Sequence, residues 1–368
     1  MKTPQSRLLA RLDAAIAKSR HPIETACLRA ERAGFLARLG HFDEARAVIG
    51  SLHAQFDPHP HAAVSAWLCM TEGWMLHFGS MSAGARDKMK RAQALAAAAG
   101  LVPLQALASA WLAHTDYLAD DVHEMLRNVA LALKLAAPDH HAARARACMV
   151  VALSYDFGER ADRAQPWYLR AREHANAEGD ETTLSALNYN ISGHRAHHAM
   201  QAALFGGDAQ DQARSALAGF EATGNFDAWV GTLSLDTLMP MQRAGLASVQ
   251  GQFGEALALY EKHFDAAARQ GQARLAAKHL ADMAWCRWHL GDTAGARRDA
   301  QAAVDGVEAT MQMDDRAVAH ARLASLFKLL DDPAASSLHA ALGHECWAQH
   351  RRFQTAWVEA LEKAGLQP

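Results

Sequence analysis

The stretch Gly40-His41-Phe42-Asp43-Glu44-Ala45 returns later in the chain as Gly251-Gln252-Phe253-Gly254-Glu255-Ala256 and again as Gly291-Asp292-Thr293-Ala294-Gly295-Ala296. Each copy follows an apolar helical stretch and precedes an Ala-rich helix start. Weaker copies begin at the following anchors: Gly79, Asp120, Gly158, Gly207 and Asp331. The anchors recur about every 40 residues, and a fixed period in this range is typical of a repeat protein whose units cannot fold alone.

The turn at each anchor has a physical explanation. A glycine at the end of one helix takes up the left-handed conformation that closes the helix at low steric cost. A short polar residue, such as Asp43 or Asp292, then caps the next helix, and Asp332-Pro333 combines a cap with proline at the first helical position. An alanine lies five residues after the anchors Gly40, Gly251 and Gly291. After Gly79, Gly158 and Gly207 the alanine comes one residue later, which predicts longer turns there.

The pattern predicts an opening helix over 5–19, eight helix pairs and a short closing helix. The predicted first helices of the pairs are 23–39, 61–78, 102–118, 139–157, 181–205, 226–250, 272–290 and 312–330. The predicted second helices are 43–55, 82–99, 121–137, 161–178, 209–223, 253–270, 293–310 and 333–350, with a capping helix over 353–364. Pro240 is expected to kink the helix over 226–250, because it cannot donate the backbone hydrogen bond.

The turns at 39–45 and 251–256 resemble the helix junction of the tetratricopeptide repeat (TPR) family. The longer period is similar to that of helical-repeat sensor domains of bacterial transcriptional activators and of peptide-pheromone receptors. This resemblance implies one TPR-like solenoid domain over 1–368, an all-α right-handed superhelix in which the first helices line a concave groove. No ATPase module or helix-turn-helix accompanies the repeats.

Charge, cysteine spacing and hydropathy exclude several classes of function. The net charge of −3 and the pI near 6.7 give no basic surface for nucleic acid or anionic membrane. The five cysteines are scattered, which indicates free thiols in a reducing compartment. No signal peptide or long apolar run is present. We therefore expect a cytoplasmic protein that binds neither nucleic acid nor membrane.

No catalytic or cofactor motif is found, and no cofactor or metal is predicted. His344-Glu345 and His350 approximate a zinc-protease motif, but the second histidine is two residues too far along the helix. His194, His197 and His198 have a spacing compatible with a metal, although no acidic or cysteine residue lies beside them in sequence. A polar helix face, or histidines that hydrogen-bond a ligand without a metal, explains them better.

Candidate ligand-binding residues follow from the resemblance, because certain positions before each anchor face the groove in that family. Together with their neighbours these positions are Asn190, His194, His197, Gln201, Trp111, His114, Tyr155, Arg243, Asp282, Trp285 and His289. The segment 188–195 supports the choice, because Asn, Ser and Gly are unfavourable inside a helix. A solvated surface helix is the competing explanation for that segment, and core packing is the competing explanation for Trp285. Trp67 and Trp74 are interpreted as packing residues.

The leading functional hypothesis is a non-catalytic adaptor or scaffold that binds a protein or peptide segment in the groove. The alternative is a sensor of a small-molecule or peptide signal that regulates a bacterial signalling or transcription pathway. An enzyme with its site inside the superhelix is the least favoured hypothesis, because no acid–base pair is evident.

Overall fold

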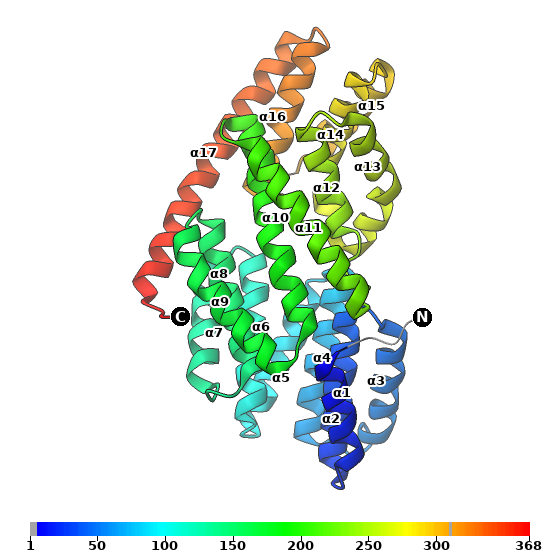
Figure 1. Ribbon diagram of the computed structural model, residues 1–368, viewed down its shortest axis with the longest axis vertical. Coiled ribbons are helices and arrows are strands. Elements are labelled where there is room, and N and C mark those ends of the chain that lie inside the picture. The colour runs from blue at the N-terminus through cyan, green and yellow to red at the C-terminus, as the bar shows by residue number, and fades with distance from the viewer. Residues whose placement is uncertain (1–5, 309–310) are drawn as a thin grey trace. The chain divides into compact units, whose positions relative to one another are not determined.

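A computed structural model of the protein describes residues 6–308 and 311–368, and in that part of the chain every regular element is a helix (Figure 1). An opening helix, α1 (Arg7–Lys18), precedes eight consecutive pairs. In the first half the pairs are α2 (Pro22–Leu39) with α3 (Phe42–Phe56), α4 (Ala62–Ser80) with α5 (Gly84–Ala98), α6 (Val102–Leu118) with α7 (Val122–Leu135), and α8 (His141–Phe157) with α9 (Ala161–Glu178). In the second half they are α10 (Glu181–Phe205) with α11 (Ala209–Val230), α12 (Leu238–Val249) with α13 (Phe253–Ala267), α14 (Ala276–His289) with α15 (Thr293–Gly306), and α16 (Met313–Leu329) with α17 (Pro333–Ala364).

The chain divides into two compact units. Unit 1 comprises residues 1–188, 223–235 and 357–368, and unit 2 comprises residues 189–222 and 236–356. Three helices, α10, α11 and α17, contribute residues to both units. The eight predicted helix pairs are confirmed, whereas a single solenoid domain over 1–368 stays a prediction.

Two helix predictions are wrong in detail. The helix expected over 226–250 is much shorter in the structure, because α11 extends to Val230 and α12 begins only at Leu238. Pro240 consequently lies in the first turn of α12, where a missing N–H group breaks no helical hydrogen bond. The helices expected over 333–350 and 353–364 form one continuous helix, α17, rather than a helix and a separate cap.

The left-handed glycines predicted at the strong anchors are confirmed, and so is the cap by Asp292. Gly40, Gly251 and Gly291 have φ values of 89°, 77° and 85°. The cap predicted for Asp43 is wrong, because α3 begins at Phe42 and its N-cap residue, His41, makes no side-chain cap hydrogen bond.

At the Gly79 and Gly158 anchors the left-handed residue comes later, at Met81 (φ 49°) and Glu159 (φ 57°). The longer turns predicted there are wrong, because the connections 81–83 and 158–160 are as long as 250–252 and 290–292 at the strong anchors. The backbone of Met81 and of Glu159 thus adopts a left-handed conformation that glycine would adopt at lower steric cost.

Small side chains bring the helices close together. Many buried residues are alanines with no exposed surface, among them Ala30, Ala33 and Ala37 of α2. Four of the five free cysteines are buried as well, namely Cys69, Cys148, Cys286 and Cys346. Burial raises the pKa of the Cys148 thiol to about 11 and that of Cys286 to about 12. Within residues 6–308 and 311–368, no helix has both the length and the apolar character that a membrane span requires.

Candidate binding site

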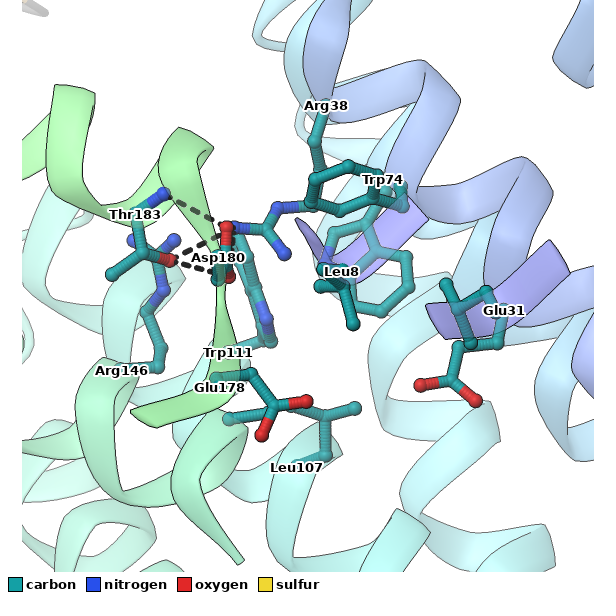
Figure 2. Close-up of a pocket in the computed structure, with 13 residues that line it drawn as sticks. Leu8, Glu31, Arg38, Trp74, Leu107, Trp111, Arg146, Glu178, Asp180 and Thr183 are labelled. Carbon is teal, nitrogen blue, oxygen red and sulfur yellow. Dashed lines mark hydrogen bonds and ion pairs between the residues drawn. The ribbon is translucent and has the colours of Figure 1, made fainter. Parts of the chain in front are cut away.

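A pocket in unit 1 gathers aromatic, apolar and charged side chains from the first helices of four successive pairs (Figure 2). Arg38 comes from α2, Trp74 from α4, Trp111 from α6 and Arg146 from α8. The pocket opens to solvent, and its free space is about 30 Å³, enough for about two water molecules. Both tryptophans are almost fully buried, and their ring centroids lie 5.6 Å apart in an edge-to-face arrangement.

A buried ion pair closes one side of this pocket. Asp180, the residue before α10, accepts hydrogen bonds from Nη2 of Arg38 at 2.7 and 3.0 Å (Figure 2). It also caps α10, because Oδ1 accepts from the backbone N–H of Thr183 at 3.0 Å. Burial by itself would raise the pKa of Asp180, but Arg38 and these hydrogen bonds lower it below the ordinary value. Asp180 is therefore a carboxylate at neutral pH.

Arg146 lies in the same pocket without an anionic partner. Its residue is 5% exposed, and its guanidinium carbon lies 3.8 Å from the ring centroid of Trp111. Nη1 approaches only the sulfur of Met149, at 3.4 Å, and the buried Nε has no hydrogen-bond acceptor. Burial, and then the charge of Arg38, lower the pKa of Arg146 to about 9, although the charge of Asp180 opposes them. The guanidinium is thus desolvated, with the more distant charge of Asp180 as its compensation and no ion pair of its own.

Two histidines beside Trp111 contribute no charge. The rings of His77 and His114 lie 5.9 and 5.8 Å from that of Trp111. Burial, and then Arg146, lower the pKa of His77 to about 4 and that of His114 well below its ordinary value. His114, which the sequence analysis selected, is therefore a neutral packing partner of Trp111.

Helix α1 covers the remaining side through Leu8 and Leu12. It is held there by Ser6 and Arg7, which donate hydrogen bonds to Glu181 at 2.7 and 2.8 Å. Glu31 faces the same pocket, and burial, followed by the nearby charge of Glu178, raises its pKa to about 7. Glu31 is thus partly protonated at neutral pH.

Unit 2 contains a second pocket of about 30 Å³, and Asp282 lies in its wall. Tyr260 donates a hydrogen bond to Asp282 at 2.8 Å. Nε of Arg322 lies 2.8 Å from Asp282 Oδ1, although its N–H is not directed at that oxygen. Lys278 faces the same pocket and donates to Asp315 at 2.8 Å. The charges around this pocket are therefore largely matched within the protein.

The candidate residues on α10 also belong to unit 2. His197 contacts Asp314 at 2.7 Å, whereas Gln201 is buried and its Nε2 has no hydrogen-bond acceptor. His194 is packed so that burial lowers its pKa to about 3, and Asn190 is partly buried. His197, Asp314 and Asp315 bring potential ligand atoms within 4.8 Å of one another. Within that group Asp315 already accepts a hydrogen bond from the ammonium group of Lys278.

The other candidates are dispersed. Trp285 is partly buried, with the guanidinium carbon of Arg322 4.9 Å from its ring centroid. His289 is exposed and stacks on Phe253 at 4.0 Å. In unit 1, Tyr155 is buried, and in unit 2 Arg243 is exposed. Among the eleven candidates, only Trp111 lines the unit 1 pocket and only Asp282 lines the unit 2 pocket.

Sequence reasoning missed Arg38, Arg146 and Asp180. The family rule that selected the other candidates, applied to the first repeat, would have selected Arg38, which lies two residues before the Gly40 anchor. Trp74 was interpreted as a packing residue, and it both packs and lines the pocket. Nothing in the sequence pairs Asp180 with Arg38, because they are 142 residues apart.

Comparison with known proteins gives structural but no sequence matches. No protein family model matches the chain, and no curated protein matches it. A Rap protein solved in complex with competence and sporulation factor is 12% identical, with a TM-score of 0.52 over 96% of this chain and 92% of that one. The apo form of RapI is also 12% identical, with a TM-score of 0.45 over 94% of this chain and 92% of that one. The similarity to the first structure shows that this chain has the TPR-like helical-repeat fold of Rap proteins.

Proposed function

We propose that this protein is a non-catalytic regulator that binds a peptide or protein segment against the first helices of the pairs in unit 1. The observation that carries the proposal is the pocket formed by Arg38, Trp74, Trp111 and Arg146. Buried aromatic and arginine side chains are the usual anchors of peptide recognition, because they combine a large apolar area with directed hydrogen bonding.

The state of the titratable groups supports a binding role rather than catalysis. A general base must be free to accept a proton and must reach its substrate. Asp180 is occupied by Arg38 and by the cap of α10, and His77 and His114 are buried. These groups stabilise a binding surface better than they would perform acid–base chemistry.

The comparison supports a peptide signal as the ligand. The Rap protein of similar fold is described as complexed with competence and sporulation factor. By analogy of fold we propose a signalling role for this chain, in the cytoplasm of a bacterium, where its free thiols stay reduced. A small-molecule signal is the alternative.

Native mass spectrometry of protein purified gently from its own host tests the proposal. We expect an adduct with the mass and fragmentation pattern of a peptide. Ala142 is partly buried at the pocket wall. The Ala142→Phe variant should lose the adduct, because the phenylalanine ring fills the pocket. Ala130, exposed on α7, gives the matched control Ala130→Phe, which should retain it.

The other outcomes are equally informative. A non-peptide adduct that Ala142→Phe abolishes would replace the proposal by the small-molecule sensor. A peptide adduct that survives Ala142→Phe would place the binding surface elsewhere. A synthetic copy of any peptide found should stabilise the folded protein by about 2.7 kcal/mol at one hundred times its Kd.

A further inference from the structure

The pocket of unit 1 contains two buried arginines whose surroundings differ. Arg38 donates hydrogen bonds to Asp180 and Thr183 through its Nη2, although its Nε is also buried without an acceptor. Arg146 takes part in no ion pair among the residues that the structure describes, and its Nε is buried without an acceptor. A guanidinium carries five donors in a planar fork that matches a carboxylate. The donors of Arg146 are thus largely unused.

Stacking on Trp111 accounts for only part of the cost of burying this charge. A cation over an indole ring is attracted to the ring face, but it keeps its unmet hydrogen-bonding capacity. Buried polar groups are nearly always paired, so an unpaired one calls for an explanation. Either the guanidinium is a structural support for Trp111, or it awaits an anion that the isolated chain lacks.

The walls of the pocket favour an anion with an apolar neighbour. Trp111, Leu107 and Leu8 surround the space with apolar surface (Figure 2). The free space of about 30 Å³ holds a group of two or three heavy atoms, so a ligand can place only one end in it. A carboxylate at the end of a chain has this size.

We propose that Arg146 anchors the free C-terminal carboxylate of a peptide whose last side chain is apolar. This inference rests on the proposed function, because it assigns the chemistry of one end of the same ligand. The carboxylate accepts hydrogen bonds from Nε and one Nη of Arg146, and the last side chain contacts the apolar wall.

The other charges in the pocket favour a monoanion over phosphate. Asp180, Glu31 and Glu178 all line the pocket. Arg38 neutralises Asp180, and Arg11 pairs with Glu178. Only Arg146 then contributes a positive charge that is not paired. The two negative charges of a phosphate dianion would exceed this single charge and would lie close to three carboxyl groups.

The test uses N-acetyl-leucine as the probe and N-acetyl-leucinamide as its neutral counterpart, with binding followed by tryptophan fluorescence of the full chain. We expect the acid to bind at least tenfold more tightly than the amide and than inorganic phosphate. Arg146→Met should abolish this preference and leave the melting temperature of the unliganded protein unchanged or higher. Arg146→Lys should keep the preference at reduced affinity, because an ammonium cannot form the fork. Arg170→Met, which removes an exposed arginine of α9, is the matched control and should change neither property.

Three results would overturn the inference: equal binding of acid and amide, tighter binding of phosphate, or loss of folding in Arg146→Met, which would make the guanidinium structural. Failure of the inference differs from failure of the proposed function. Peptides that bind equally well with free and amidated C-termini contradict the role of Arg146 alone. Absence of any bound or binding peptide contradicts the proposed function.

Discussion

Replacing Arg38 by methionine should destabilise unit 1 by about 3 kcal/mol, because the substitution leaves Asp180 buried without its counter-ion. The two side chains are only 8% and 5% exposed. Removing one partner of a buried ion pair costs about 3–5 kcal/mol, since the remaining charge is desolvated and uncompensated. Asp180 retains hydrogen bonds from the Thr182 hydroxyl at 2.6 Å and from the hydroxyl and N–H of Thr183 at 2.8 and 3.0 Å. The lower end of the range is therefore expected.

Urea unfolding followed by tryptophan fluorescence measures this loss, because Trp74 and Trp111 lie within 6.0 Å of the Arg38 guanidinium. The effect should also depend on pH. The pKa of Asp180 is lower in the folded than in the unfolded state, so its stabilising contribution is present above the unfolded pKa, near 4. It is lost as the pH falls through the folded pKa.

The double variant Arg38→Met with Asp180→Leu provides the decisive comparison. Removing both charges should recover a large part of the lost stability, because no uncompensated ion remains. A loss below about 1 kcal/mol in Arg38→Met, or a double variant as unstable as the sum of its parts, would refute the reasoning.

Three further predictions concern other contacts. Changing Glu31 to glutamine should raise stability by about 3 kcal/mol at pH 8 and have no effect below pH 4.5. The difference in the free energy of unfolding between variant and original protein grows between these limits, because the pKa of Glu31 is raised in the folded state and the unfolded state releases its proton first. Urea titrations at several pH values test this, and a difference that does not change with pH would contradict it. Gly34→Ala should cost about 1–3 kcal/mol and perturb the tryptophan emission, because a Cβ there would lie 2.3 Å from Cε3 of Trp74; an unchanged melting temperature would show that Trp74 moves freely. His197→Ala should cost about 1–2 kcal/mol in unit 2, because Asp314 loses its hydrogen bond at 2.7 Å, and an unchanged urea midpoint would count against that contact.

The fold was predictable because its determinants are local. Gly40, Gly251 and Gly291 end helices through their own backbone freedom, and Asp292 caps α15 by accepting a hydrogen bond from the N–H of Gly295 at 2.8 Å. The break between Val230 and Leu238 was not predictable in the same way. There the backbone N–H of Leu233 donates to the carbonyl of Leu39 at 2.7 Å, and the Ser234 hydroxyl donates to that of Arg38 at 2.7 Å. Tertiary contacts between residues that are nearly 200 positions apart thus override the local helix preference of this segment.

The candidate site was less predictable, because pocket residues depend on the rotation of each helix. The resemblance selected both Trp111 and His114 of α6, but only Trp111 lines the pocket. The two residues are three positions apart on one helix, so a small rotation about the helix axis decides which of them reaches the pocket. Which buried charge lacks a partner is likewise a property of the assembled pocket, so Arg146 could not be distinguished from other arginines in the sequence.

The distribution of the cysteines has a practical consequence for following motion in this protein. Cys27 and Cys69 lie on α2 and α4, Cys148 on α8, Cys286 on α14 and Cys346 on α17. A buried thiol reacts with an alkylating reagent only when its own helix opens to solvent. The four buried thiols are therefore built-in reporters along the array, and Cys27 is a partly exposed reference. Mass spectrometry after timed alkylation would rank the opening rates of individual helix pairs, with and without a ligand, and without introducing any label.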